Sequence, residues 1–545
     1  MHGRVKVRTT AEQDEIKRKE RAEKVKLYKA GMSLAFDMRE KGDKNEKGLA
    51  VSAKLLAPNP DIYTLWNIRR EIILHLKTLK SDDEFSQVME DELRLTEICL
   101  KNQPKSYGTW HHRCWVLDNM TNPPWKTELA LCDKYLSYDE RNFHCWDYRR
   151  FVVKRSGVSA EEELKFTDDK IAENFSNYSA WHLRSNLLPQ VYPDPNGLKP
   201  IEDNQHKHEL ELVASAAFTD PYDQSAWFYQ RWLLGRHTPE LRITHVIATK
   251  KVVCLSFNRS VSPTSPDIMV KAYGENAWKT VDGEISSYVW KRTFADATSV
   301  SEVAKVPVEL VVGGDVRQSA SLAVDGEQAC YWEQPVFEAS FSPGVTEVLR
   351  NVLDSCQTLL ELEPDTKWPL LTSVSLMQAI DRKKYKAEVL KYLDLLAKID
   401  HLRTNYYSDL KSRCIMEHQL EEWNVGNDFC LVNTALTALY HSQYLLPARR
   451  VDLRQNSLTR SLPRLASLQF CQVLILDENN LQNLEGFPSL PNLQTLSVKK
   501  NQLCLPENIE PYITLCSALT NVYIDDNPLS ATHEYCNGGF VKIPK

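Results

Sequence analysis

The sequence of 545 residues is longer than one hydrophobic core usually covers, and it therefore predicts several domains. Its net charge of −6 is small, and the basic residues are interleaved with acidic ones, which argues against nucleic-acid binding. Residues 1–40 are rich in charge and no window has the roughly 20 apolar residues of a membrane span, so we expect a soluble, cytoplasmic protein.

A repeat in which an aromatic residue, a tryptophan and an arginine follow one another at three-residue spacing fills the N-terminal part of the chain. Its units are Pro60-x-x-Tyr63-x-x-Trp66-x-x-Arg69, Pro104-x-x-Tyr107-x-x-Trp110-x-x-Arg113, Phe143-x-x-Trp146-x-x-Arg149 and Tyr178-x-x-Trp181-x-x-Arg184, with a looser fifth unit around Pro221 and Trp227. The tryptophans recur every 35 to 46 residues, which accommodates two antiparallel helices per unit. We predict an α-α solenoid over residues 1–240.

The three-residue spacing places the aromatic residue, the tryptophan and the arginine on one side of a helix. A tryptophan at such a position usually packs in a core, and the arginine that follows usually pairs with a neighbouring carboxylate, so we expect both to be structural. Asn59-Pro60 and Asp220-Pro221 are predicted to supply a helix N-cap followed by proline at the first helical position.

The helical period disappears over residues 241–345, where short runs rich in valine, threonine and aromatic residues predict an immunoglobulin-like β-sandwich inserted into the solenoid. The predicted strands are Lys251 to Phe257, Asp267 to Tyr273, Ser287 to Phe294, Val306 to Val312 and Ala329 to Phe341. Cys254, Trp290 and Cys330 imitate the cysteine and tryptophan pattern of immunoglobulin domains, but we do not expect a disulfide in a cytosolic chain. The thirteen cysteines contain no CxxC pair and no Cys/His cluster, so no metal site within this chain is predicted.

Helical character resumes over residues 346–440, as in the amphipathic run Lys386 to Ile399, and predicts a continuation of the solenoid. Residues 441–545 then carry a second repeat with Asn456, Asn479, Asn501 and Asn527 at spacings of 22 to 26 residues. This period predicts leucine-rich repeats, four coils in which each asparagine bonds backbone groups of the turn that stacks one coil on the next. The predicted fold class is therefore multidomain and mainly α.

The segments Gln103 to Arg113 and Asn142 to Trp146 closely resemble the repeats of protein prenyltransferase α subunits. An α subunit with an immunoglobulin-like insertion and leucine-rich repeats resembles the branch of this family that geranylgeranylates Rab GTPases. The resemblance implies a heterodimer with a β subunit that binds zinc and the isoprenoid. It also implies geranylgeranyl diphosphate as lipid donor and Rab GTPases, presented by a Rab escort protein, as acceptors.

The same resemblance implies roles for individual residues. Lys105 matches a lysine aimed at the isoprenoid diphosphate across the subunit interface, and we expect it to be catalytic and to lie on the first turn of a helix. Tyr107 matches a tyrosine near the same diphosphate, while Asn142 and His144 match residues that line the shared site. Phe143 departs from the farnesyl enzyme, which has a tyrosine there, so no catalytic role is carried over to it. A last candidate is His2, as a ligand to the zinc of the β subunit.

Two alternative interpretations keep the fold and change the function. One is a non-catalytic scaffold whose helical, sandwich and leucine-rich surfaces recruit other proteins. The other is the α subunit of the farnesyl or type I geranylgeranyl enzyme, which would modify CaaX peptides without an escort protein. The two additional domains and Phe143 argue against this second alternative.

Overall fold

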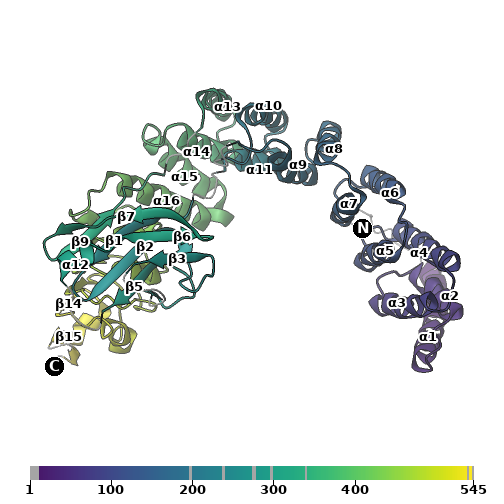
Figure 1. Ribbon diagram of the computed structural model, residues 1–545, viewed down its shortest axis with the longest axis horizontal. Helices are drawn as coiled ribbons and strands as arrows, with labels where there is room; N and C mark the ends of the chain where they lie inside the picture. The colour runs from purple at the N-terminus through teal and green to yellow at the C-terminus, as the bar shows by residue number, and fades with distance from the viewer. Residues whose placement is uncertain are drawn as a thin grey trace. The chain divides into compact units, whose positions relative to one another are not determined.

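The computed structural model describes residues 11–195, 199–235, 240–272, 278–294, 299–337, 341–536 and 539–542. The chain divides into two compact units, Met1–Tyr192 and Pro193–Lys545 (Figure 1). Within the described residues, no helix has the length and apolar character needed to cross a membrane.

Nine α helices make up the described part of the first unit. They are α1 (Ala11–Glu40), α2 (Glu46–Leu56), α3 (Tyr63–Lys77), α4 (Asp82–Asn102), α5 (Tyr107–Asn119), α6 (Trp125–Tyr138), α7 (Phe143–Ser156), α8 (Ala160–Glu173) and α9 (Tyr178–Val191). Helix α4 packs on α5, α6 on α7, and α8 on α9, so the predicted solenoid of helix pairs is confirmed.

The tryptophan of every repeat is buried and makes the same hydrogen bond. Its indole nitrogen donates to the backbone carbonyl six residues earlier, namely Trp66 to Pro60 (2.8 Å), Trp110 to Pro104 (2.9 Å), Trp146 to Glu140 (2.8 Å), Trp181 to Phe175 (2.7 Å) and Trp227 to Pro221 (3.1 Å). The turn before each of these helices is thereby fixed from inside the core. We call this bond the tryptophan lock.

The predicted starts of two helices are wrong, since α3 and α11 begin three residues after the proline and not at it. Helix α3 begins at Tyr63 after Ile62, and α11 (Gln224–Leu233) begins after Asp223, whose side chain accepts a hydrogen bond from the backbone of Ser225. Asn59-Pro60 and Asp220-Pro221 therefore do not cap these helices. The proline carbonyl is needed as the acceptor of the lock, so the chain turns once more between the proline and the helix.

The arginine of each repeat in the first unit forms an ion pair with an acidic residue of a neighbouring helix, as predicted. Arg113 on α5 is typical: its Nη2 lies 2.7 Å from Oε1 of Glu128 on α6, and its Nη1 donates to Thr96 on α4 at 2.7 Å. The other pairs are Arg69 with Glu92, Arg149 with Glu163 and Arg184 with Asp168. Arg113 and Glu128 are almost completely buried, so Arg113 links α4, α5 and α6 from inside the core.

The second unit begins with α10 (Asp203–Thr219) and α11 and resumes its helices after the β region. The later helices are α13 (Pro343–Leu362), α14 (Lys367–Asp381), α15 (Lys386–Ile399) and α16 (Thr404–Glu422). Helix α13 packs directly on α10, and α14 packs on α11. The helical stack is therefore continuous across more than a hundred residues of inserted sequence.

The inserted β region consists of two antiparallel sheets. Their strands are β1 (Ile243–Ala248), β2 (Val252–Val261), β3 (Ile268–Lys271), β4 (Lys279–Thr280), β5 (Ser287–Thr293), β6 (Val308–Val312), β7 (Asp315–Ala320), β8 (Ala323–Asp325) and β9 (Gln328–Trp332), with the short helix α12 (Val300–Ala304) between β5 and β6. The sheet orders are β4-β5-β2-β1-β9-β8 and β3-β6-β7. Leu255 and Trp290 from the first sheet share one buried core with Leu310 from the second, and Cys254 and Cys330 are free thiols.

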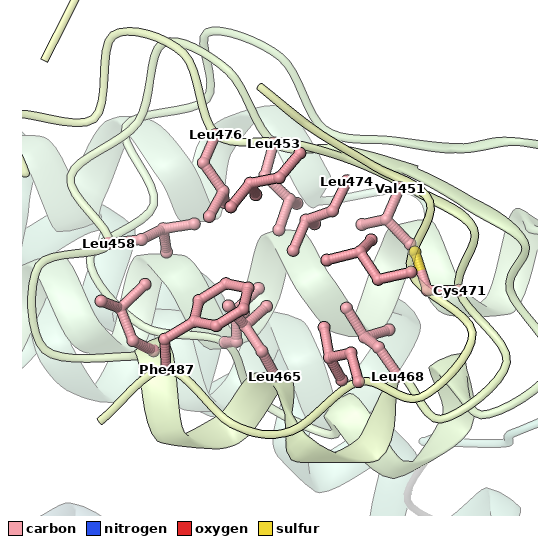
Figure 2. Close-up of a cluster of buried hydrophobic side chains, with 14 of the residues drawn as sticks. Val451, Leu453, Leu458, Leu465, Leu468, Cys471, Leu474, Leu476 and Phe487 are labelled. Carbon is pink, nitrogen blue, oxygen red and sulfur yellow. The ribbon is translucent and has the colours of Figure 1, made fainter. Parts of the chain in front are cut away.

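The C-terminal part is a parallel sheet of five short strands. They are β10 (Phe429–Cys430), β11 (Arg450–Asp452), β12 (Val473–Ile475), β13 (Thr495–Ser497) and β14 (Asn521–Tyr523), followed by a hairpin of β15 (His533–Cys536) and β16 (Gly539–Lys542). Figure 2 shows their core, in which strand residues such as Val451 and Leu474 face Leu465 and Leu468 of the returning segments. Short turns such as α17 (Glu510–Ile513) complete the coils.

Asparagines connect consecutive coils, as predicted. Asn479 donates to the carbonyl of Leu453 at 2.9 Å and accepts from the backbone of Leu458 at 3.2 Å, both in the preceding coil. The strand β10 adds one coil before the four that were predicted. The prediction missed this coil because it has Thr434 at the position where the later coils have the asparagine. The hydroxyl and backbone nitrogen of Thr434 both donate to Asn456.

Candidate active site

Lys105 lies in the turn between α4 and α5, and its side chain is 61% exposed. The expectation that it belongs to the first helical turn is wrong, because Ser106 is the N-cap of α5 and the helix begins at Tyr107. The hydroxyl of Ser106 accepts a hydrogen bond from the backbone of Thr109 at 3.4 Å. Lys105 thus lies outside the helix, in the loop just before Ser106, and the N-cap bond of Ser106 fixes the end of this loop.

The turn that carries Lys105 is held from two sides. The carbonyl of Pro104 accepts one hydrogen bond from the indole of Trp110 at 2.9 Å and another from Nδ2 of Asn142 at 3.0 Å. Asn142 is buried at the N-cap of α7, where its Oδ1 also accepts from the backbone of His144. Asn142 therefore lies next to the turn of Lys105. Its bond to Pro104 joins the loops of neighbouring repeats, and its bond to His144 fixes Asn142 itself at the start of α7.

A carboxylate that the sequence did not single out contacts Lys105. Oδ2 of Asp139, the residue after α6, lies 2.9 Å from the Lys105 ammonium. The hydrogen bond from Lys105 holds the pKa of the Asp139 carboxyl below its usual value. The only signal in the sequence is its place in the loop, since Asn59, Asn174 and Asp220 stand at the matching position of other repeats.

Aromatic rings surround the same loop. Tyr107 is 70% exposed, and its ring lies edge-on to the ring of His144 at 4.2 Å and 6.1 Å from the ring of Phe143. Burial lowers the pKa of His144 more than the nearby carboxylates of Asp147 and Asp61 raise it. The neutral form of His144 is therefore favoured, and the site combines this imidazole with the ammonium of Lys105, the carboxylate of Asp139 and the phenol of Tyr107.

The four candidates Lys105, Tyr107, Asn142 and His144 thus meet where the N-terminal ends of α5 and α7 lie side by side. His2 lies outside the described residues. Among the residues that the structure describes, no group of three or more histidine, cysteine, aspartate or glutamate side chains is placed to hold a metal ion.

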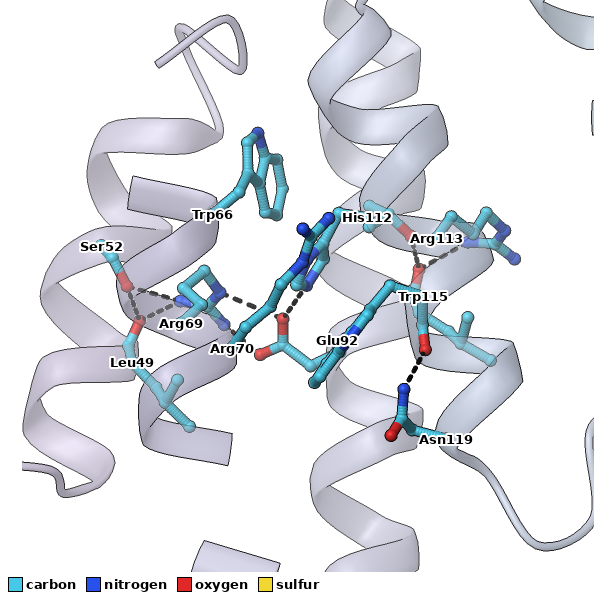
Figure 3. A network of polar contacts seen from close by, with 12 residues as sticks. Leu49, Ser52, Trp66, Arg69, Arg70, Glu92, His112, Arg113, Trp115 and Asn119 are labelled. Atoms are coloured by element: carbon cyan, nitrogen blue, oxygen red, sulfur yellow. Dashed lines mark hydrogen bonds and ion pairs between the residues drawn. The ribbon is translucent and has the colours of Figure 1, made fainter. Parts of the chain in front are cut away.

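A buried polar network lies one repeat earlier and was missed by the sequence analysis (Figure 3). His112 is fully buried between the rings of Trp66 and Trp115, and its Nε2 lies 2.9 Å from Oε2 of Glu92. Burial lowers the pKa of His112, although the contact with Glu92 acts in the opposite direction. Arg70 joins the network from α3.

The repeats explain why His112 lies there. The residue two places after the tryptophan reaches the buried glutamate of the preceding helix, and Tyr148 does the same to Glu128. The signal was therefore present as the repeat position. His112 is a structural group that links α5 to Glu92 on α4.

The comparisons with known proteins follow the same repeats. A family model described as protein prenyltransferase alpha subunit repeat matches residues 89–120, 125–156, 160–191 and 206–237, which hold the second to fifth predicted units. The unit of Trp66 lies outside the matched segments. The repeat and its loops define the class of the chain as the protein prenyltransferase α subunits.

Whole-chain relatives narrow this class. The geranylgeranyl transferase type-2 α subunits of Sus scrofa and Homo sapiens are each 40% identical to the chain, over 97% of the chain and 96% of the relative. The corresponding subunit of Dictyostelium discoideum is 32% identical over 76% of the chain and all of its own length. The chain belongs to the family of geranylgeranyl transferase type-2 α subunits, and the resemblance found in the sequence is confirmed.

A solved structure is also similar. The Candida albicans protein geranylgeranyltransferase-I complexed with GGPP matches with a TM-score of 0.41 and 18% sequence identity, over 71% of the chain and 90% of the solved chain.

Proposed function

We propose that the chain is the α subunit of a Rab geranylgeranyltransferase and is active only as a heterodimer with a zinc-bearing β subunit. The heterodimer transfers the geranylgeranyl group from geranylgeranyl diphosphate to C-terminal cysteines of Rab GTPases, which a Rab escort protein presents. The names of the relatives and the matched repeats support this proposal. The observation that carries it is the exposed ammonium of Lys105 on a loop fixed by Trp110 and Asn142.

Lys105 is the catalytic group that this chain contributes. The zinc of the β subunit favours the thiolate form of the acceptor cysteine. The thiolate sulfur forms a bond to the first carbon of the isoprenoid while the diphosphate leaves with the electron pair of the broken bond. A fixed ammonium beside the leaving oxygen lowers the barrier, by about 2 to 4 kcal/mol in comparable sites, because negative charge accumulates there.

The neighbouring residues have supporting roles. The exposed phenol of Tyr107 donates a hydrogen bond to the diphosphate, and the neutral imidazole of His144 holds the Tyr107 ring edge-on at 4.2 Å. Asn142 is a positioning residue, since its amide bonds the turn of Lys105. We also propose His2 as a ligand to the zinc of the β subunit.

We further propose that the domains are those expected from the sequence. Residues 1–240 and 346–440 form the helical solenoid, and residues 241–345 form an immunoglobulin-like sandwich, which the two stacked antiparallel sheets support. Residues 441–545 form leucine-rich repeats, which the asparagine bonds between parallel coils support.

The test is transfer of labelled geranylgeranyl from its diphosphate to a Rab protein, with escort protein present and the chain co-expressed with a β subunit. Lys105→Ala should form the heterodimer and lose about ten-fold or more in rate, since each factor of ten corresponds to about 1.4 kcal/mol. Lys101→Ala is the matched control, because Lys101 is also 61% exposed but pairs with Glu97 on α4. A wild-type heterodimer that transfers nothing, or a Lys105→Ala variant with the wild-type rate, would contradict the proposal.

A further inference from the structure

Two polar contacts join the loop of Lys105 to the loop of the next repeat. One is the bond from Asn142 to the carbonyl of Pro104, and the other is the 2.9 Å contact between Lys105 and Asp139. Among the residues that the structure describes, Asp139 is the carboxylate that lies within ion-pair distance of Lys105. The inference drawn from this pair rests on the proposed function of Lys105.

Asp139 is itself held in place. Its Oδ1 accepts a hydrogen bond from the backbone of Arg141 at 3.1 Å, and its carbonyl accepts from the backbone of Asn142 at 3.0 Å. One carboxylate oxygen is thus used to fix the loop, and the other is left to contact Lys105. Asp139 remains 36% exposed, so the pair lies at the surface where the diphosphate would approach.

A lysine side chain has four rotatable bonds and three donor hydrogens. One hydrogen bond to Asp139 restricts the ammonium to a small region and leaves two donors for another acceptor. The carboxylate also offsets part of the positive charge that an incoming diphosphate would meet. The first effect favours the transition state, which needs the ammonium in one place, whereas the second weakens the attraction of Lys105 for the diphosphate in both the intact substrate and the transition state.

We propose that Asp139 is a positioning residue for the transfer reaction. It holds the ammonium of Lys105 where the leaving diphosphate develops its charge, and this gain in position outweighs the attraction that its own negative charge removes. The contribution of Lys105 is thereby directed to the transition state.

The first test is Asp139→Asn in the full heterodimer. Asparagine keeps the shape of the side chain and can still accept from the backbone of Arg141, but it carries no charge to hold Lys105. The single-turnover rate of transfer should fall about two- to ten-fold, the usual effect of releasing one flexible side chain. Affinity for a fluorescent analogue of geranylgeranyl diphosphate should stay equal or rise. A fall in both rate and affinity would overturn the inference, because a general disturbance of the loop would lower both.

The second test separates a structural role from positioning of Lys105. In a Lys105→Ala background, Asp139→Asn should change the rate less than about two-fold, because the ammonium that it positions is gone. An equal loss in both backgrounds would overturn the inference, as would a wild-type rate for Asp139→Asn alone. Asp139→Glu keeps the charge and should have a rate between those of Asp139→Asn and the wild type. If the chain with Asp139→Asn does not form a heterodimer, Asp139→Ser takes its place in both tests.

Another ion pair between the same two repeats provides a matched control. Asp118 on α5 lies 2.7 Å from Arg155 on α7 and is 41% exposed, so Asp118→Asn removes a similar contact between the same two repeats at their other end. This variant should keep the wild-type rate. The inference and the proposed function fail separately: a wild-type rate for Lys105→Ala removes the proposed role of Lys105, whereas a slow Lys105→Ala with an unaffected Asp139→Asn removes only the role of Asp139.

Discussion

Replacing Glu128 by glutamine tests whether the buried arginine pairs hold the repeats together. Glu128 accepts hydrogen bonds at 2.7 Å from both Nε and Nη2 of Arg113, and it also accepts from the hydroxyl of Tyr148. Glutamine keeps the shape but leaves the buried guanidinium without a counter-charge. Removing one partner of a buried pair lowers stability by about 3 to 5 kcal/mol, and we expect Glu128→Gln to lie near the lower limit because one acceptor oxygen remains.

The assay is urea unfolding of the full chain, followed by circular dichroism and by tryptophan fluorescence. Glu90→Gln is the control, since Glu90 is 51% exposed and pairs with Arg94 on the same helix, which predicts a change below about 1 kcal/mol. If Glu128→Gln also unfolds within about 1 kcal/mol of the wild type, the buried pair is not needed for stability and the reasoning is refuted.

Two further predictions concern packing and pH. A Cβ at Gly108 would lie 3.0 Å from the Trp66 indole nitrogen and 3.3 Å from the Pro60 carbonyl, so Gly108→Ala should lower the unfolding free energy by about 1 to 3 kcal/mol in urea titration; wild-type stability would contradict this. Burial lowers the pKa of His245 to about 3, whereas an unfolded histidine titrates near 6.5. Stability should therefore fall as the pH drops through this window, and His245→Gln should remove about 1.4 kcal/mol per pH unit of that slope; an unchanged slope would show that His245 is not responsible.

The helix pairs could be predicted because their signal is repeated and local. Trp110 and Arg113 recur with a fixed spacing, and a single helix face explains both. The start of each helix could not be predicted in the same way, because Pro60 bonds Trp66, a residue already inside the following helix. A proline after Asn or Asp usually marks the first residue of a helix, but Pro60 lies outside α3.

The missed residues depend on contacts between repeats. Asp139 reaches Lys105 only because consecutive loops lie side by side, and neither sequence segment indicates that distance. The strand β10 was missed for a different reason, since Thr434 replaces the asparagine that marks the other coils. The site residues Lys105 and Tyr107 were found through a family resemblance, and their roles in catalysis are still predictions.

The tryptophan lock affects how the surface of the repeat loops can change during evolution. In each loop, the residue after the locked carbonyl is not needed for the bond, and in the first unit these residues are Asp61, Lys105, Arg141 and Ser176. The backbone acceptor is available whichever side chain follows it. Each repeat thus offers one position where mutation can alter surface chemistry with little penalty in folding, and a lysine can arise at one repeat while the others keep unrelated side chains.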